Sequence, residues 1–544
     1  MALTRRDFLY RTAPLAALPF LTPACGSSDD EGPAPPGGPF RHGVASGDPL
    51  TDRVVIWTRV TPEADTPETI DVEWQVAEDP ELTAVVAQGT ASTDDAVDHT
   101  VKVDVDGLEP GRTYYYQFSA LGESSPLGRT KTLPEGSVAR ARFAVASCAN
   151  YPYGFFNAYA MIARRPDLDA VLHLGDYLYE YGAGDFGDGA GGRVPDPKTE
   201  VVSLTDYRRR HAQYKTDPDL QEAHRQHPFI AVWDDHETAN DAWRGGAQNH
   251  EPESEGDWET RKNAALQAYF EWMPIRDPAA NASGQIYRSF RFGTLIDLVL
   301  LDTRLAGRDA PSTEPCDPAA LLDPNRQLLG EEQEQWFVSE LVDSQASGTT
   351  WRVVGQQVMF AQLVNTLSTE MCVFNPDQWD GYAANRARIL QALSEHEIDN
   401  VVIITGDLHS SWANEVTADP FDANAYDPAS GTGSQAVELI TPAVTSPGIE
   451  DGEQAQNLAA LVAETHPHVK YVDLNRRGYL VLDVTPEQAQ AEWYHVDTIT
   501  KRSHSESLAA AFFTRSGENH LQPAPSPTAP IASAPPLAPA ARQT

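Results

Sequence analysis

Six short apolar runs are spread along this chain, and four of them end in side chains that bind metal ions. The runs occupy residues 141–148, 169–176, 229–236, 295–304, 350–357 and 400–409. Stretches of helical spacing lie between several of them, for example 204–214 and 384–397, which predicts a layered α/β architecture. In open α/β sheets, ligands bind at the carboxyl ends of strands. We therefore expect residues that are distant in sequence to meet at one site.

The strand ends supply carboxylates, imidazoles, a thiol and a phenol. These donors are Cys148, Asp176, Tyr179, Asp234, Asp235, His236, Glu237, Asp407 and His409. Thiolate and phenolate favour a soft or redox-capable ion such as iron, whereas carboxylates also accept calcium, magnesium or manganese. Each residue alone has a simpler explanation, because an Asp after a strand often caps a helix and a Cys is often a small buried apolar group. Four strand ends carry such residues in an order that would bring them to one site, and this favours a metal centre over the simpler explanations.

The segments GDYLYEYG, WDDHE, LDTR and GDLHSSW, with SC ending the first strand, resemble the alkaline phosphatase D family of calcineurin-like metallophosphoesterases. Residues 40–60 are similar to the opening of that family's β domain, and WDGY at 379–382 matches as well. The resemblance implies a four-layer αββα metallophosphoesterase sandwich preceded by a small all-β sandwich domain. It also implies a metal-dependent enzyme that hydrolyses phosphate monoesters, diesters or both.

The resemblance further implies the ligands of one metal. Cys148, Tyr179 and His409 would bind iron as Fe³⁺, and Asp176 would bridge to a second ion. That second ion would be calcium, with manganese, magnesium or zinc as alternatives.

Asp235 and Asp407 would hold the second metal, and His236 would approach the phosphate and the leaving-group oxygen. A metal-bound water would lose a proton and attack phosphorus as hydroxide. His236 would donate a proton to the leaving-group oxygen.

Other polar residues near these motifs are weaker candidates for substrate binding. They are Asn150, Asn240 and Arg304, and Arg304 has the alternative of bracing a strand through a surface carboxylate. Asn249 and His250 are expected at the rim of the pocket. The Gly/Asp-rich residues 183–200 are expected to form a loop at its mouth, with a calcium-binding loop as the alternative.

The N-terminus predicts export. Arg5 and Arg6 lie in a twin-arginine pattern, and residues 13–21 are moderately apolar, as in a signal read by the twin-arginine export machinery. Cys25 precedes a polar, Pro/Gly-rich tether, as in a bacterial lipoprotein, but residues 22–24 form a poor lipobox. The chain is thus expected in the periplasm or outside the cell, either anchored by lipid at Cys25 or cleaved and released.

Four regions are expected along the chain. Residues 1–38 would be the signal and a flexible linker, 39–135 a fibronectin type III-like β-sandwich, 139–515 the catalytic domain and 516–544 a disordered Pro/Ala-rich tail. In an oxidising compartment Cys316 and Cys372 can pair, and two free thiols are the alternative.

The charge composition disfavours one class of function. Acidic residues outnumber basic ones by 79 to 40, giving a formal charge of −39, which disfavours a general nucleic-acid partner. The expected substrate is a small phosphoester or a phospholipid, the latter cleaved by a phospholipase D-type activity of the same family. Two other hypotheses about the function remain: a non-catalytic, surface-anchored binding protein, and a redox protein that uses iron at Cys148 and Tyr179.

Overall fold

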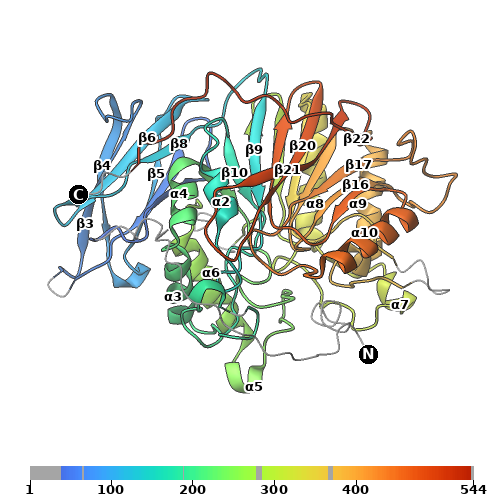
Figure 1. Cartoon of the computed structure of the whole chain (residues 1–544), viewed down its shortest axis with the longest axis horizontal. Helices are drawn as coiled ribbons and strands as arrows, with labels where there is room; N and C mark the ends of the chain where they lie inside the picture. Colours follow the sequence, from blue (N-terminus) through green and yellow to red (C-terminus); the bar gives the residue numbers. More distant parts are fainter. Residues whose placement is uncertain (1–37, 64–65, 188, 277–284, 365–371, 541–544) are drawn as a thin grey trace, which may run out of the picture.

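The computed structural model describes residues 38–63, 66–187, 189–276, 285–364 and 372–540. Two large sheets lie against each other in its centre, and helices lie outside them (Figure 1). The proposed export signal and Cys25 fall outside the described residues.

The first sheet has ten strands. Across the sheet they are β22 (Gln522–Pro523), β21 (Glu506–Arg515), β20 (Gln488–Val496), β19 (Gly478–Val484), β9 (Ala141–Ala146), β10 (Ala170–His173), β11 (Pro228–Ala231), β1 (Val44–Gly47), β2 (Val54–Arg59) and β5 (Thr100–Val105). Strands β9, β10, β11 and β1 run parallel to one another. All residues of β9, β10 and β11 are buried, as is usual for parallel strands covered on both faces.

The second sheet has seven strands. Across the sheet they are β12 (Arg288–Phe292), β13 (Ile296–Leu300), β14 (Trp351–Gln356), β15 (Val401–Thr405), β17 (Ala436–Ile440), β16 (Ser411–Val416) and β18 (Val469–Asp473). Strands β13, β14, β15 and β17 are parallel. One buried cluster contains side chains of both sheets, such as Phe143 and Phe292, whose ring centroids lie 4.9 Å apart, so the sheets pack face to face.

Helices complete the outer layers. They are α2 (Asn157–Ile162), α3 (Leu204–Tyr214), α4 (Pro218–Gln226), α5 (Pro252–Glu255), α6 (Trp258–Trp272), α7 (Pro318–Leu321), α8 (Glu331–Ser347), α9 (Ala383–Glu395) and α10 (Gly452–Thr465), with short 3₁₀ turns η1 (Asp95–Val97), η2 (Ala190–Gly192) and η4 (Trp379–Tyr382). Helices α2 and α4 contact the first sheet, and α8 and α10 contact the second. The expected four-layer α/β sandwich is confirmed.

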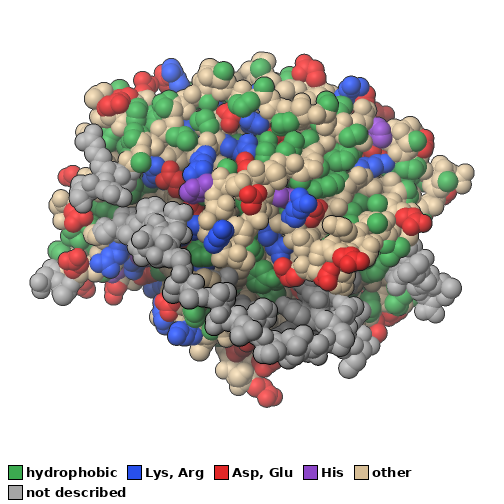
Figure 2. Space-filling view, viewed as in Figure 1, with side chains coloured by type: hydrophobic (Ala, Val, Ile, Leu, Met, Phe, Trp, Pro, Cys, Tyr) green, Lys and Arg blue, Asp and Glu red, His purple; other side chains and the backbone are tan. Residues whose placement is uncertain are grey.

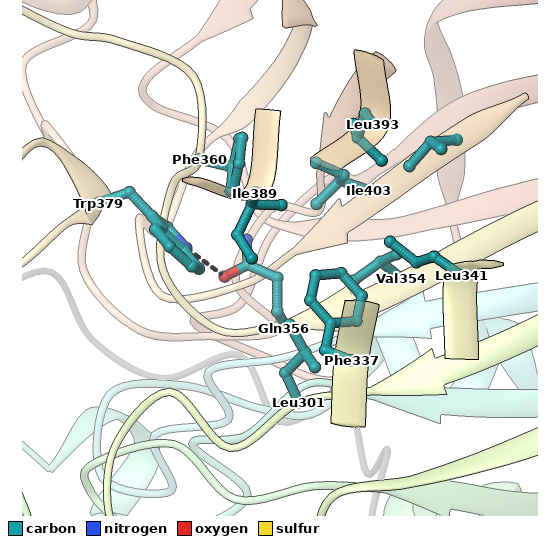
Figure 3. Close-up of a pocket in the computed structure, with 11 residues that line it drawn as sticks. Leu301, Phe337, Leu341, Val354, Gln356, Phe360, Trp379, Ile389, Leu393 and Ile403 are labelled. Atoms are coloured by element: carbon teal, nitrogen blue, oxygen red, sulfur yellow. Dashed lines mark hydrogen bonds between the residues drawn. The ribbon is translucent and has the colours of Figure 1, made fainter. Parts of the chain in front are cut away.

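A second apolar core lies between the second sheet and helices α8 and α9. It encloses a cavity of about 10 Å³, shown in Figure 3, which is too small for anything larger than one water. At its edge the Trp379 indole donates a hydrogen bond to Gln356 Oε1 at 3.1 Å. This packing fixes the position of η4. The residue before η4, Gln378, reaches the candidate site described below.

The N-terminal β region is built onto the edge of the first sheet. Its strands β1, β2 and β5 extend that sheet, with β1 parallel to β11. The remaining strands form a separate sheet that shares an apolar core with them: β3 (Ile70–Ala77), β4 (Val85–Thr93), β6 (Thr113–Ala120), β7 (Glu123–Ser124) and β8 (Gly128–Lys131). An N-terminal β domain is therefore present, and it is continuous with the first sheet.

The Pro/Ala-rich end of the chain differs from the expectation of disorder. Residues 524–540 follow β22 and run along the molecule back to the N-terminal β region (Figure 1). Tyr115 and Gln226 hydrogen-bond to the backbone of Pro536 and Ala538 at 2.7 and 2.8 Å. A segment rich in proline has few backbone donors to satisfy, and these side chains of the folded domains satisfy its backbone groups.

Cys316 and Cys372 form a disulfide, which confirms that they pair. Within the described ranges, we find no helix with the length and apolar character needed to cross a membrane.

On the face shown in Figure 2, basic side chains are interspersed with acidic ones despite the charge of −39. Ion pairs between the two kinds of side chain occur in the molecule, for example between Arg165 and Glu506 at 2.8 Å.

Candidate metal centre

The strand ends of both sheets meet, as the sequence predicts, and bring metal-binding atoms together. Among the described residues, three groups have ligand atoms within 4.8 Å of one another, and all their members are buried: Cys148, Asp176 and His409; Asp176, Asp235 and His236; and Asp234, Asp235 and Asp407. Asp176 and Asp235 each belong to two groups. The three groups therefore form one continuous centre.

Backbone conformation sets several of these ligands. Cys148, Asp176, Asp407 and His409 have φ angles of 61°, 53°, 62° and 55°, in the left-handed region that non-glycine residues seldom adopt. Such strain persists only where the surroundings enforce it, and it concentrates at functional sites. Here the backbone amide of Cys148 donates to the carbonyl of Gly175 at 3.2 Å, which ties the turn after β9 to the turn after β10.

Gly175 is required by close packing. Its φ is 98°, and a Cβ there would lie 2.4 Å from Cβ of Asp234. The absence of a side chain lets the turn after β10 lie directly against the turn after β11. This contact brings Asp176 next to Asp235.

We call Cys148, Asp176, Tyr179 and His409 the Cys148 cluster. The Tyr179 hydroxyl donates to Asp176 Oδ2 at 2.8 Å and lies 3.1 Å from His409 Nε2. His409 Nδ1 lies 2.7 Å from the carbonyl oxygen of Pro447, so Nδ1 carries the proton and Nε2 faces the cluster. Burial, together with the charge of Asp176, raises the pKa of Tyr179 well above its ordinary value. Without a cation, the phenol therefore keeps its proton.

We call Asp234, Asp235 and Asp407 the Asp407 cluster, and Arg304 holds it together. The fully buried guanidinium donates to Asp234 at 2.5 Å and to Asp407 and Asp377 at 2.8 Å. Gln378 Nε2 also donates to Asp407 Oδ2 at 2.9 Å. All three guanidinium nitrogens of Arg304 are thus engaged by carboxylates. Arg304 thus braces carboxylates, and these are buried rather than at the surface.

His236 is oriented by an acidic residue that the sequence interpretation missed. Its Nδ1 lies 2.7 Å from Oε2 of the buried Glu180. Glu180 Oε1 accepts hydrogen bonds from the Asn240 amide at 2.8 Å and from Asn249 Nδ2 at 2.9 Å. Asn240 was expected at the substrate, but its Nδ2 donates to Gln248 and its backbone supports Glu180. Burial opposes the charge on His236, but Asp235, Glu180 and Asp176 outweigh burial and raise its pKa to about 10.

Glu237 is a second acidic residue whose role the sequence left unassigned. Its carboxylate accepts from the amides of Tyr177 at 2.6 Å, Asp234 at 2.8 Å and Asp176 at 3.1 Å. It therefore joins the turns after β10 and β11. Both Glu180 and Glu237 lie inside the motifs GDYLYEYG and WDDHE, so their position was the signal that could have identified them.

Comparison with known proteins shows the family. The model of the PhoD-like phosphatase family matches residues 143–493, and the model of its N-terminal domain matches residues 26–134. The chain belongs to the PhoD-like phosphatase family. It is 36% identical over 506 residues to alkaline phosphatase D of Bacillus subtilis (strain 168), covering 90% of this chain and 83% of that protein. It also matches the solved structure of PhoD with a TM-score of 0.81 and 35% identity, over 91% of this chain and 94% of that one. The chain is accordingly a phosphoric ester hydrolase, as the resemblance implied.

The donor set of this PhoD-like phosphatase suits cations. Six buried carboxylates lie in or beside the centre: Asp176, Glu180, Asp234, Asp235, Glu237 and Asp407. The facing cations are Arg304 and a protonated His236. Burial, with Asp235 and Asp176, raises the pKa of Asp234 to about 8 despite Arg304. Buried carboxylates in such excess need metal ions or protons. Thiol, imidazole and phenol on one side and carboxylates on the other fit two unlike ions.

The other candidates lie around this centre. Asn150 is fully buried, and its Nδ2 donates to the carbonyl of Phe186 at 2.9 Å, in the expected mouth loop. His250 Nδ1 lies 3.1 Å from Glu255, and His250 belongs to none of the three ligand groups. Asn150 thus supports the loop over the site.

Proposed function

We propose that this chain is an exported, metal-dependent phosphoesterase of the PhoD-like family that hydrolyses phosphate monoesters, diesters or both. The observation that carries the proposal is the continuity of the three ligand groups through Asp176 and Asp235. A pair of adjacent cation sites is the arrangement that clamps a transferring phosphoryl group.

The Cys148 cluster would hold iron, because it combines thiol, phenol and imidazole donors. The Asp407 cluster would hold calcium, because its donors are carboxylate oxygens. Manganese, magnesium and zinc are the alternatives. Bound cations would supply positive charge for the phosphoryl oxygens and make the attacking water more acidic.

The chain's own residues would perform the remaining steps. Glu180 accepts a hydrogen bond from Nδ1–H of His236 and so fixes the orientation of the ring. Nε2 of His236 would then donate a proton to the departing ester oxygen. Arg304 would keep Asp234 and Asp407 in place as the substrate's charge enters. Burial of all these groups would exclude water and strengthen their electrostatic effect.

The decisive assay measures p-nitrophenol release from the nitrophenyl monoester and the bis-nitrophenyl diester, side by side, with and without chelator. Turnover that chelator abolishes is the expected result, and the ratio of the two rates would distinguish phosphatase from diesterase or phospholipase D-type work. Absence of turnover on both esters, with metals measured in the protein, would favour a binding or redox protein instead.

Export is part of the proposal. The twin-arginine pattern at Arg5 and Arg6 supports it, and the disulfide between Cys316 and Cys372 is typical of an oxidising compartment. Replacing both arginines by lysine should keep the chain in the cytoplasm, as fractionation would show. Mass spectrometry of the exported chain would distinguish a lipid on Cys25 from cleavage and release.

A further inference from the structure

Phe186 is an aromatic side chain placed over the metal centre by the mouth loop. Its ring centroid lies 5.6 Å from that of Tyr179, 6.2 Å from that of His236 and 6.4 Å from that of His409. The Phe186 and His236 rings are stacked, with an interplanar angle of 21°. Phe186 remains partly exposed, whereas those three residues are buried. It therefore lies on the solvent side of the proposed acid and two proposed ligands.

The loop that carries Phe186 is held at several points. Just before it, the buried Arg210 donates to the carbonyl oxygens of Tyr179 and Tyr181. Within it, Asn150 Nδ2 donates to the carbonyl of Phe186 itself.

Further along the loop, Arg193 holds it in place. Its guanidinium donates to Asp217 at 2.7 Å and lies 3.6 Å from the ring centroid of Tyr151. These buried contacts, although the loop is rich in glycine, fix the place of the aromatic ring.

A second aromatic residue extends the same surface. The ring of Tyr181 lies 5.2 Å from Phe186 and 5.4 Å from His236, and it is also partly exposed. Below this pair, the centre is lined by carboxylates and imidazoles. An ester whose phosphate lies at the centre would thus have an apolar, aromatic surface available next to His236 for its organic group.

We propose that Phe186 forms the wall of a subsite for the organic group of the substrate and favours esters whose group beside the phosphate is flat and apolar. This inference rests on the proposed function. Offset stacking between aromatic rings adds to the energy of simple burial, and its size predicts a measurable preference.

The test compares aryl with alkyl esters in the metal-loaded full chain. In Phe186→Ala, kcat/KM should fall about 3- to 10-fold for the nitrophenyl monoester or diester. It should change much less for glycerol 2-phosphate or glycerophosphocholine, the alkyl esters of the same two classes. Phe186→Tyr should restore the preference, and metal content should be unchanged. Phe421→Ala, at another exposed phenylalanine, is the matched control and should leave the ratio as it is.

The outcomes separate the two proposals. If the unmodified chain hydrolyses these esters but Phe186→Ala slows aryl and alkyl substrates equally, or slows neither, the subsite is refuted and the proposed function stands. If the unmodified chain with bound metals hydrolyses neither class, the proposed function fails and the subsite fails with it.

Discussion

Most residues of the Cys148 cluster are placed by left-handed backbone turns, whereas the carboxylates of the Asp407 cluster are held mainly by side chains from distant segments. Cys148, Asp176 and His409 have left-handed φ angles, and in the Asp407 cluster Asp407 alone does. Arg304, which follows β13, binds Asp234 and Asp407, and Gln378, which precedes η4, binds Asp407. The Cys148 cluster should therefore depend on local turns, and the Asp407 cluster on a buried network of ion pairs.

The largest effect is expected at His236, which lies where the two clusters meet. His236→Ala should lower kcat about 10²–10⁴-fold, because general-acid assistance to the leaving group is lost. Metal content should be retained, as elemental analysis would show. His396→Ala, an exposed histidine at the end of α9, should change neither quantity. Loss of metal in His236→Ala would instead show that His236 is a metal ligand, and the two clusters would then share a ligand.

Removal of Arg304 should damage the Asp407 cluster selectively. Arg304→Ala leaves buried carboxylates without their cation, and we expect a loss of about 3–5 kcal/mol in the free energy of unfolding. Urea denaturation measures this loss. The control is Arg291→Ala, whose ion pair with Asp297 is formed by an arginine that is 64% exposed, so the change should stay within about 1 kcal/mol. Equal losses in the two variants would remove the difference between the clusters.

A smaller effect is expected at Glu180, which positions His236. Glu180→Gln keeps the shape but weakens a charge-assisted hydrogen bond, so kcat should fall about 10- to 100-fold. The alkyl and aryl esters should be affected alike, and metals should remain. Glu334→Gln, at a carboxylate that pairs with Arg388, serves as the control. An unchanged kcat in Glu180→Gln would exclude a positioning role.

The smallest effect is expected at Ser446, on the side of the Cys148 cluster. Its hydroxyl lies 2.6 Å from the Tyr179 oxygen and 2.9 Å from the carbonyl of Cys148. Because the backbone already holds this cluster, Ser446→Ala should cost about 2- to 10-fold in activity. A loss as large as that of His236→Ala would mean that side chains, rather than turns, hold the Cys148 cluster as well.

The sequence could predict the ligands but not all the side chains that hold them. The ligands of both clusters, Tyr179 apart, lie just after the ends of apolar strands, so strand ends and parallel topology were enough to predict that they meet. The role of Arg304 was left between phosphate binding and bracing, because Asp377 and Gln378 come from a segment far along the chain with no strand pattern. Composition also failed to predict that residues 516–540 are ordered. The side chains that bind this segment, such as Tyr115 at the carbonyl of Pro536, are distant in sequence, so composition gives no sign of them.

The most direct test of the central claim is metal analysis of the exported chain combined with ester hydrolysis before chelation, after chelation and after metal is restored. The account predicts two metal ions per chain, loss of hydrolysis on chelation and recovery on readdition, with Asp176→Asn losing metal and activity together. Full hydrolysis by the metal-free chain would contradict it.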